Sequence, residues 1–207
     1  MQETSKHPEA ELTRPFYFLR HGETFYNREG RMQGQSDAPL SDLGLAQAEQ
    51  AAAVLAEQPI ERIVSSPLSR ATRTAEASAR RLGLPVEHDP ALMEAHFGIY
   101  QDKPHPPWVP DFWAGRFHPE GGEDFQQFRD RVWPALVAAV AASPNTLVVA
   151  HGGVWFAART KVRMIPDVVD MPNAVPVHVV PEGAVWRVTA LGGASLPEGS
   201  DFYQRPS

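Results

Sequence analysis

Short apolar runs alternate with helix-like segments along this chain, and the alternation limits the folds open to it. Such runs, bounded by turn residues, are typical of central strands in a parallel sheet. They cover residues 16–19, 61–64, 146–150, 175–180 and, as a partner of the last, 184–190. The sequence therefore predicts an α/β fold, a three-layer α/β/α arrangement with a doubly wound, mostly parallel sheet.

Helical patterns fill the first two gaps between these strands. Residues 41–57 begin with Ser41, a favourable N-cap, and carry apolar residues at helical spacing. Residues 67–82 have Pro67 at the expected first helical position and Gly83 just past the end. Proline at the start and glycine after the end are typical of helices, so we expect a helix in each gap.

Two more helices are expected in the second half of the chain. An alanine-rich segment over about 122–142 contains Pro134, which predicts a kink or a break there. The fourth helix should follow Gly153. Together the four helices supply both outer layers of the predicted fold.

The length of 207 residues suits one domain, which we place at 16–195. Residues 1–15 are polar and are expected to be a disordered lead-in, and 196–207 a C-terminal tail. Residues 101–121 interrupt the strand-helix rhythm with five prolines and two tryptophans. Such an insertion is either a functional lid or a loop packed by its own aromatic side chains, and we refer to it as the lid insertion.

Composition excludes several classes of function. A formal net charge of −6 argues against a nucleic-acid or membrane-surface partner, because both need basic patches. The chain has no cysteine, which excludes disulfides and thiolate chemistry. Without an apolar leader or a segment of transmembrane length, we expect a cytoplasmic protein. A second subunit could pair with the C-terminal strands, although no residue pattern requires a dimer.

Histidines and arginines follow the predicted strands at their carboxyl ends. Arg20 and His21 follow the first strand, His151 follows the strand at 146–150, and Arg70 lies one turn into a helix after the second strand. Ligands of doubly wound sheets bind beyond these ends. Guanidinium groups match phosphate oxygens, and helix N-termini add N–H donors. The sequence therefore predicts a site for a small phosphorylated ligand.

A family resemblance extends this interpretation across about residues 16–190. The chain resembles the histidine phosphatase superfamily, the phosphoglycerate-mutase-like clan, in five motifs that occur in the family's order. They are Leu19-Arg20-His21-Gly22-Glu23-Thr24 with Asn27, Met32-Gln33-Gly34 and Pro39-Leu40-Ser41; Ser65 to Ala75; Met93-Glu94 with Phe97-Gly98; Gly121-Gly122-Glu123; and Val149 to Gly153.

The resemblance implies a role for each matching residue. His21 is expected to be the nucleophile that accepts the phosphoryl group, and Glu94 the proton donor to the leaving oxygen. The other implied residues bind the substrate phosphate or lie beside it: Arg20, Asn27, Gln33, Gly34, Arg70, His151 and Gly152. We expect no cofactor and no metal, so arginine and histidine must neutralise the phosphoryl oxygens. Glu23, the rival acid, is expected to have a structural role.

Departures from the mutase pattern favour a phosphatase. Mutases look longer in the region of the lid insertion and carry an arginine pair there, where this chain has only Lys103 and Arg116. Phe97 replaces a usual tyrosine, and Gly153 stands where mutases tend to have asparagine. A cofactor-dependent phosphoglycerate mutase remains the alternative. Two other classes also stay open: a non-catalytic phosphoryl-binding module, although no pocket residue is missing, and a metal-dependent hydrolase.

Overall fold

The computed structural model describes residues 13–197, so most of the predicted lead-in and tail lies outside the described residues. Seven strands form one sheet in the order β3-β2-β4-β1-β6-β7-β5. Four strand pairs are parallel, namely β1–β4, β2–β4, β2–β3 and β5–β7. β6 is antiparallel to both β1 and β7. The predicted fold class is confirmed. The strands are β1 Phe16–Arg20, β2 Arg62–Ser65, β3 Val86–His88, β4 Thr146–Ala150, β5 Arg163–Ile165, β6 Val177–Glu182 and β7 Val185–Ala190.

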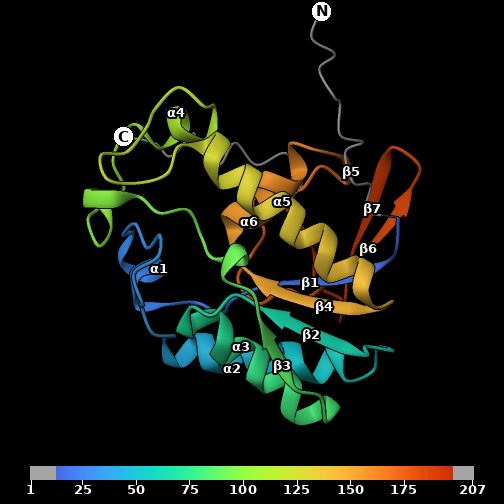
Figure 1. The fold of residues 1–207 in the computed structure, drawn as a ribbon. Coiled ribbons are helices and arrows are strands. Elements are labelled where there is room, and N and C mark those ends of the chain that lie inside the picture. Colours follow the sequence, from blue (N-terminus) through green and yellow to red (C-terminus); the bar gives the residue numbers. More distant parts are fainter. Residues whose placement is uncertain (1–12, 198–207) are drawn as a thin grey trace, which may run out of the picture.

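Helices cover both faces of the sheet. α2 and α3 lie on one face, and α5 and α6 on the other (Figure 1). The helices are α1 Phe25–Glu29, α2 Asp42–Leu55, α3 Ser69–Leu82, α4 Val109–Trp113, α5 Phe125–Ala142 and α6 Gly152–Arg159, with 3-10 turns η1 Pro90–Leu92 and η2 Gly98–Tyr100. Among residues 13–197, no helix has both the length and the apolar character needed to cross a membrane.

Successive side chains of β1 pack into two separate hydrophobic clusters, one on each face of the sheet. Phe16 and Phe18 pack in the cluster that contains residues of α5 and α6, whereas Tyr17 and Leu19 pack in the cluster that contains residues of α2 and α3. All four side chains are buried. Successive residues of a strand point to opposite faces, and a strand buried on both faces therefore needs the continuous apolar run that β1 has.

The predicted helices form, with local differences. α2 begins after Ser41, whose hydroxyl accepts from the Gly44 amide at 3.0 Å. α3 begins at Ser69, not at Pro67, because the Ser66 amide still donates to the β4 carbonyl of Val149 at 3.0 Å. Strand pairing thus extends to the residue just before Pro67, and the helix starts two residues later than predicted.

The helix at 122–142 also differs from expectation. α5 begins at Phe125 behind a capping box formed by Asp124 and Gln127, and it continues through Pro134 without a break. Its neighbours Val132 and Leu136 are buried in the core. Packing of the apolar face offsets the one backbone hydrogen bond that proline removes.

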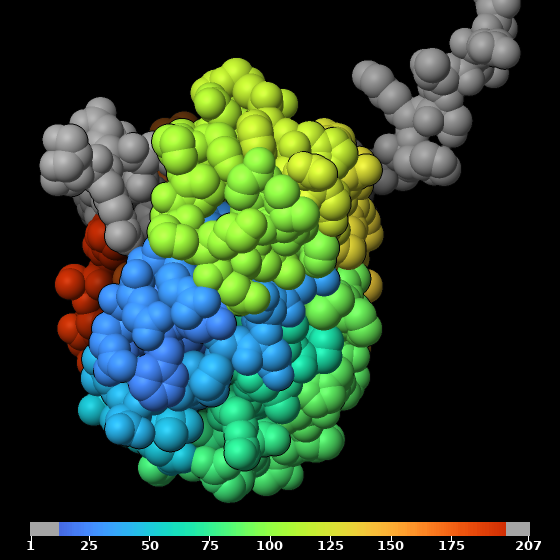
Figure 2. Space-filling model, turned by 90° about the vertical axis from the view of Figure 1, so that its left-hand side faces the viewer, coloured from blue at the N-terminus to red at the C-terminus, as the bar shows by residue number. Residues whose placement is uncertain are grey.

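The lid insertion contains α4 and is anchored in the main core. Phe112 is fully buried in the same cluster as β1 and α5. Trp108 stacks on Phe117 with ring centroids 4.3 Å apart, and Trp113 packs edge-on against Phe112. Figure 2 shows residues of about 100–120 seated against the N-terminal segment that includes α1. The aromatic residues of the insertion therefore pack it onto the domain.

Candidate functional site

The register of β1 and β4 places two histidines side by side. Arg20 pairs with Ala150 across these parallel strands, so His21 and His151 leave the sheet at the same level. The His21 amide donates to the Ala150 carbonyl at 3.0 Å, and the two imidazole centroids are 5.2 Å apart. Both rings are buried, with exposures of 3% and 0%. The predicted convergence of the two strand-end histidines is observed.

The lone pair of His21 that is available for reaction is on Nε2. Its Nδ1 lies 2.8 Å from the Gly22 carbonyl oxygen, which can only accept, so Nδ1 carries the proton. Burial, and then the nearby Arg70 and Arg20 guanidinium groups, lower the pKa of His21 well below its usual 6.5. The ring is therefore neutral at physiological pH, and Nε2 can act as a nucleophile.

The glycine after His21 is explained by packing, not by the ligand. A Cβ on Gly22 would overlap the backbone carbonyl of Gly44 in α2, so the glycine lets α2 approach the nucleophile loop. Gly152, after the other histidine, leaves ordinary van der Waals space beside Arg20, whose Cζ would lie 3.5 Å from an added Cβ. Gly22 is therefore required by helix packing, whereas Gly152 leaves room beside Arg20.

Arg70 is a fully buried cation held by backbone carbonyls. Its two terminal nitrogens donate to Gly34 at 2.6 Å and Ser36 at 2.8 Å. Burial lowers its pKa to about 10, which still leaves it charged at neutral pH. Arg20 is fixed in a similar way, by the Met171 carbonyl at 2.7 Å. Both guanidinium groups are therefore held in place before any ligand binds.

Three residues of this site each have a buried nitrogen that lacks a hydrogen-bond partner within residues 13–197. These nitrogens are Nε of Arg20, Nε of Arg70 and Nδ1 of His151. The other nitrogen of His151, Nε2, lies 2.8 Å from the Ser66 hydroxyl. Buried polar groups without a partner are rare in proteins and call for an explanation. Two of the three belong to fixed cations, which points to an anion as the missing partner.

Glu94 enters the same cavity from the loop between η1 and η2. Its Oε1 accepts from the Ala95 amide and its Oε2 from the Gly153 amide in α6, each at 3.0 Å. A Cβ on Gly153 would overlap Oε1 of Glu94 and press on the Trp113 ring. A carboxyl group can rest on the first turn of α6 only because residue 153 is glycine.

Thr24 orients the amide side chains of Asn27 and Gln33 in the same cavity. Its hydroxyl lies 3.1 Å from Asn27 Oδ1 and 2.9 Å from Gln33 Oε1, and its amide also donates to Asn27. Both amide oxygens therefore face Thr24, and the NH2 ends of Asn27 and Gln33 are the ends available to a ligand in the cavity that they line. Glu23 accepts from the Ser41 hydroxyl at 2.7 Å and is absent from the cavity wall.

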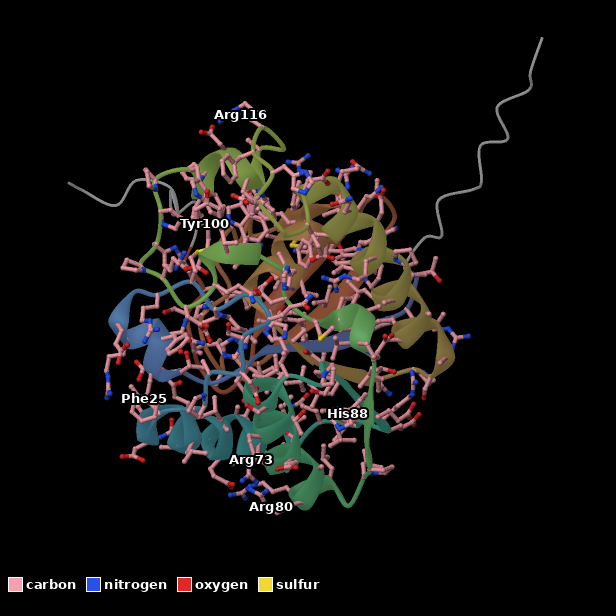
Figure 3. The ribbon with its side chains drawn as sticks, turned by 60° about the vertical axis from the view of Figure 1, so that its left-hand side comes forward. Phe25, Arg73, Arg80, His88, Tyr100 and Arg116 are labelled. Carbon is pink, nitrogen blue, oxygen red and sulfur yellow. The ribbon has the colours of Figure 1, made fainter. Side chains whose placement is uncertain are left out.

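The cavity has a volume of about 250 Å³. Eight of the nine predicted site residues line it, and the ninth, His151, is fully buried beside His21. The lid insertion contributes His105, Val109 and Trp113, but neither Lys103 nor Arg116. Arg116 pairs with Asp111 and lies at the outer tip of the lid, at the opposite end of the molecule from Arg73 and Arg80 (Figure 3).

Sequence reasoning missed the segment before β6. Asp170 and Asn173 line the cavity, and the Asn173 amide donates to the His21 carbonyl at 2.8 Å. Asp170 forms an ion pair with Arg20 at 3.2 Å. These residues lie in a loop with no helical or strand periodicity. The Pro172-Asn173 turn pair after an apolar run was the one signal available, and it does not indicate a site.

No group of three histidine, aspartate or glutamate side chains among the described residues is arranged to hold a metal ion. The metal-dependent hydrolase considered from the sequence therefore has no candidate centre in this part of the chain.

Two buried histidines and two fixed arginines thus lie in or beside the cavity at the carboxyl ends of the central strands. The family model of the histidine phosphatase superfamily (branch 1) matches residues 16–174. This chain belongs to that superfamily.

Curated relatives include both phosphatases and mutases. Glucosyl-3-phosphoglycerate phosphatase of Mycolicibacterium vanbaalenii is 40% identical over 157 residues, covering 68% of this chain and 70% of the relative. The Mycobacterium tuberculosis protein of that name is 36% identical over 207 residues, covering 91% and 89%. "Probable phosphoglycerate mutase GpmB" of Yersinia pestis is 35% identical over 148 residues, covering 66% and 68%.

Solved structures agree with the fold. The mycobacterial glucosyl-3-phosphoglycerate phosphatase in complex with VO3 superimposes with a TM-score of 0.74 at 31% identity, covering 89% of this chain and all of that one. The Thermus thermophilus protein TTHB049 gives 0.71 at 31% identity, covering 86% and 99%.

Proposed function

We propose that this protein hydrolyses phosphate monoesters of small metabolites through a phosphohistidine intermediate on His21. One observation carries the proposal: Arg20 and Arg70 line one cavity with His21, the His151 ring lies 5.2 Å from the His21 ring, and each of these three neighbours has an unpartnered buried nitrogen. Phosphoryl transfer depends mainly on positioning and on neutralising the phosphoryl oxygens, and this arrangement can do both.

In the first step, Nε2 of His21 attacks phosphorus and forms a P–N bond as the ester P–O bond breaks. The leaving alkoxide takes a proton from Glu94 in its acid form and departs as the alcohol. Arg20, Arg70 and His151 hold the transferred oxygens by charge and hydrogen bonds. The Gly22 carbonyl stabilises the cationic character that the imidazole gains, because it accepts from Nδ1.

In the second step, water attacks the phosphohistidine. Glu94, now a carboxylate, accepts a proton from that water, and the P–N bond breaks with its electron pair returning to Nε2. Inorganic phosphate leaves and the starting protonation states are restored. The residues present supply every proton transfer of this cycle, so we propose no cofactor and no metal.

Two features support a phosphatase rather than the alternative, a cofactor-dependent mutase. The lid insertion contributes His105, Val109 and Trp113 to the cavity wall, and neither of its two cations, Lys103 and Arg116, reaches the cavity. The insertion therefore does not provide a pair of arginines that could hold a substrate carboxylate. Asp170 adds a negative charge beside Arg20, which disfavours a ligand carrying a second phosphate. Water is then the acceptor that resolves the intermediate.

For the substrate, we propose a phosphorylated metabolite of the class to which glucosyl-3-phosphoglycerate belongs, on which the named mycobacterial relatives act. The cavity wall combines Trp113 and Phe156 with polar side chains such as Asn173, a mixture suited to an alcohol larger than glycerate. A cytoplasmic location and a possible dimer remain predictions from the sequence.

The test is single-turnover hydrolysis of p-nitrophenyl phosphate in EDTA, with acid-labile phosphoenzyme trapped from wild type and from His21→Ala. We expect phosphoenzyme and matched phosphate release in wild type only. Hydrolysis without a trapped intermediate, or with equal labelling of His21→Ala, would contradict the proposal. A subsequent screen compares release from glucosyl-3-phosphoglycerate and 3-phosphoglycerate with interconversion of 2- and 3-phosphoglycerate, which a mutase would favour.

A further inference from the structure

The loop that carries Glu94 receives three hydrogen bonds from one side chain of α5, and the Gln35 side-chain amide also donates to the Glu94 carbonyl at 3.0 Å. Arg131 donates from one terminal nitrogen to the carbonyls of Ala91 and Met93, each at 2.9 Å. Its other terminal nitrogen reaches the Glu94 carbonyl at 3.3 Å. Three carbonyls around the proposed acid thus share one guanidinium group.

Glu123 fixes that guanidinium group from the opposite side. It accepts from Nε of Arg131 at 2.8 Å and from a terminal nitrogen at 2.7 Å, a bidentate pair. The same carboxylate accepts from the His96 amide at 2.9 Å. Arg131 and Glu123 side chains are only 23% and 21% exposed, which favours a stronger interaction than a surface pair makes.

The glycine before Glu123 allows this approach. A Cβ on Gly122 would overlap the His96 carbonyl, and the Glu123 amide donates to that same carbonyl at 2.8 Å. The Gly121-Gly122-Glu123 motif, which has no part in the chemistry proposed above, therefore bonds directly to the loop of the acid.

We infer that Arg131 and Glu123 are positioning residues for the proton donor: together they fix the backbone of residues 91–96, so that the Glu94 carboxyl meets the leaving oxygen. The inference rests on the proposed function, since it concerns a proton transfer within that reaction. Neither Arg131 nor Glu123 lines the cavity, so they act through Glu94 and not on the substrate. Lysine in place of Arg131 keeps the charge and loses the planar fork that reaches three carbonyls and a carboxylate.

The test compares an ester that needs a proton donor with one that does not. Arg131→Lys should lower the single-turnover rate on glycerol 2-phosphate by about 10- to 100-fold, because small misplacements of a catalytic group are costly. The single-turnover rate of p-nitrophenol release reports the first step alone, and because the phenolate leaves without help this rate should fall by less than about 3-fold. Glu123→Gln keeps the side-chain size but loses the bidentate pair, and it should show the same difference in loss between the two esters. It serves as a second test if the Arg131→Lys variant folds poorly.

A double variant separates positioning from general damage. In a Glu94→Gln background, Arg131→Lys should slow glycerol 2-phosphate hydrolysis no further, since the group it positions is already disabled. Arg187→Lys breaks a bidentate pair with Glu182 that is remote from the cavity, and it is the matched control with rates like wild type. Equal losses on both esters, or multiplying losses in the double variant, would overturn the inference.

Hydrogen exchange gives a readout that needs no activity. Arg131→Lys should raise amide exchange in residues 91–96 selectively. If wild type hydrolysed neither ester, the proposed function would fail, while unchanged protection of 91–96 in Arg131→Lys would independently refute the positioning role.

Discussion

The amide of Gly153 donates to the Glu94 carboxyl at 3.0 Å, and an added Cβ at residue 153 would overlap that same carboxyl. The first turn of α6 therefore holds the carboxyl group of the proposed acid in position. The first N–H groups of a helix have no partner within the helix, so the Gly153 amide is free to hold the Glu94 carboxyl in position.

Gly153→Ala should displace Glu94 while leaving the helix intact. The added Cβ would meet both the flexible end of Glu94 and the Trp113 ring, so the carboxyl must move and the shift of the ring should lower the melting temperature slightly. We expect about a 10-fold or greater loss in the single-turnover rate of alcohol release from alkyl phosphates, and little change in the single-turnover release of p-nitrophenol, which needs no proton donor. Single-turnover kinetics of the first step on both esters checks this, and a variant as fast as wild type on alkyl phosphates would show that this contact is dispensable.

Asp170→Asn should tighten phosphate binding. The Asp170 carboxylate lies 3.2 Å from Arg20 and opposes an incoming anion, so its neutralisation should lower the inhibition constant of inorganic phosphate by about 3- to 10-fold. Inhibition measured at low and at high salt checks the origin of the effect, because a charge effect shrinks with screening. Weaker phosphate binding by Asp170→Asn would mean that the carboxylate mainly orients Arg20.

Stability should fall as the solution becomes acidic. Burial, followed by nearby cations, lowers the pKa of His21 and of His151 well below 6.5. As the pH drops below about 6.5, these histidines become protonated in the unfolded chain but stay neutral in the folded protein. Proton binding therefore favours the unfolded state, and the free energy of unfolding decreases. Each histidine can contribute up to about 1.4 kcal/mol per pH unit in that range.

Urea unfolding between pH 8 and pH 5 measures this slope. Above about pH 7 both rings are neutral in either state, and their contribution should be flat. His151→Gln should give a shallower slope than wild type below pH 6.5. Identical slopes for the two proteins would show that His151 takes up its proton in the folded state.

The lid insertion should be required for stability as well as for lining the cavity. Phe112 is fully buried in the main core, so Phe112→Ala should lower the free energy of unfolding by about 3–5 kcal/mol. Ile99→Ala removes a side chain that is 48% exposed and should change it by only about 0.5 kcal/mol. Comparable midpoints for the two variants in urea would indicate that the insertion packs loosely in solution.

The central half of the fold and the residues of the pocket could be predicted because their signals are local. The strand bearing Phe16 to Leu19 is a continuous apolar run, and the residues after it form a specific motif. The sequence did not reveal β3, β5, α1 or α4, which have three to five residues each and depend on tertiary contacts.

The contribution of Asp170 and Asn173 had no local signal either. Both reach the cavity because the antiparallel pairing of β6 with β1 brings the loop before β6 back to the nucleophile. Long-range pairing of this kind is not encoded in periodicity. The start of α3 was misplaced for a similar reason, since Ser66 is held by β4.

The pairing of Arg20 with Ala150 also has a consequence for how such a protein can change over generations. An insertion or deletion within β1 or β4 would shift one histidine along the sheet relative to the other and turn neighbouring side chains to the wrong face. Those strands therefore cannot change in length. Residues 101–121 lie outside this strand register, so the lid insertion can vary without moving the two histidines, whereas the loop before β6 holds Arg20 through Met171 and His21 through Asn173.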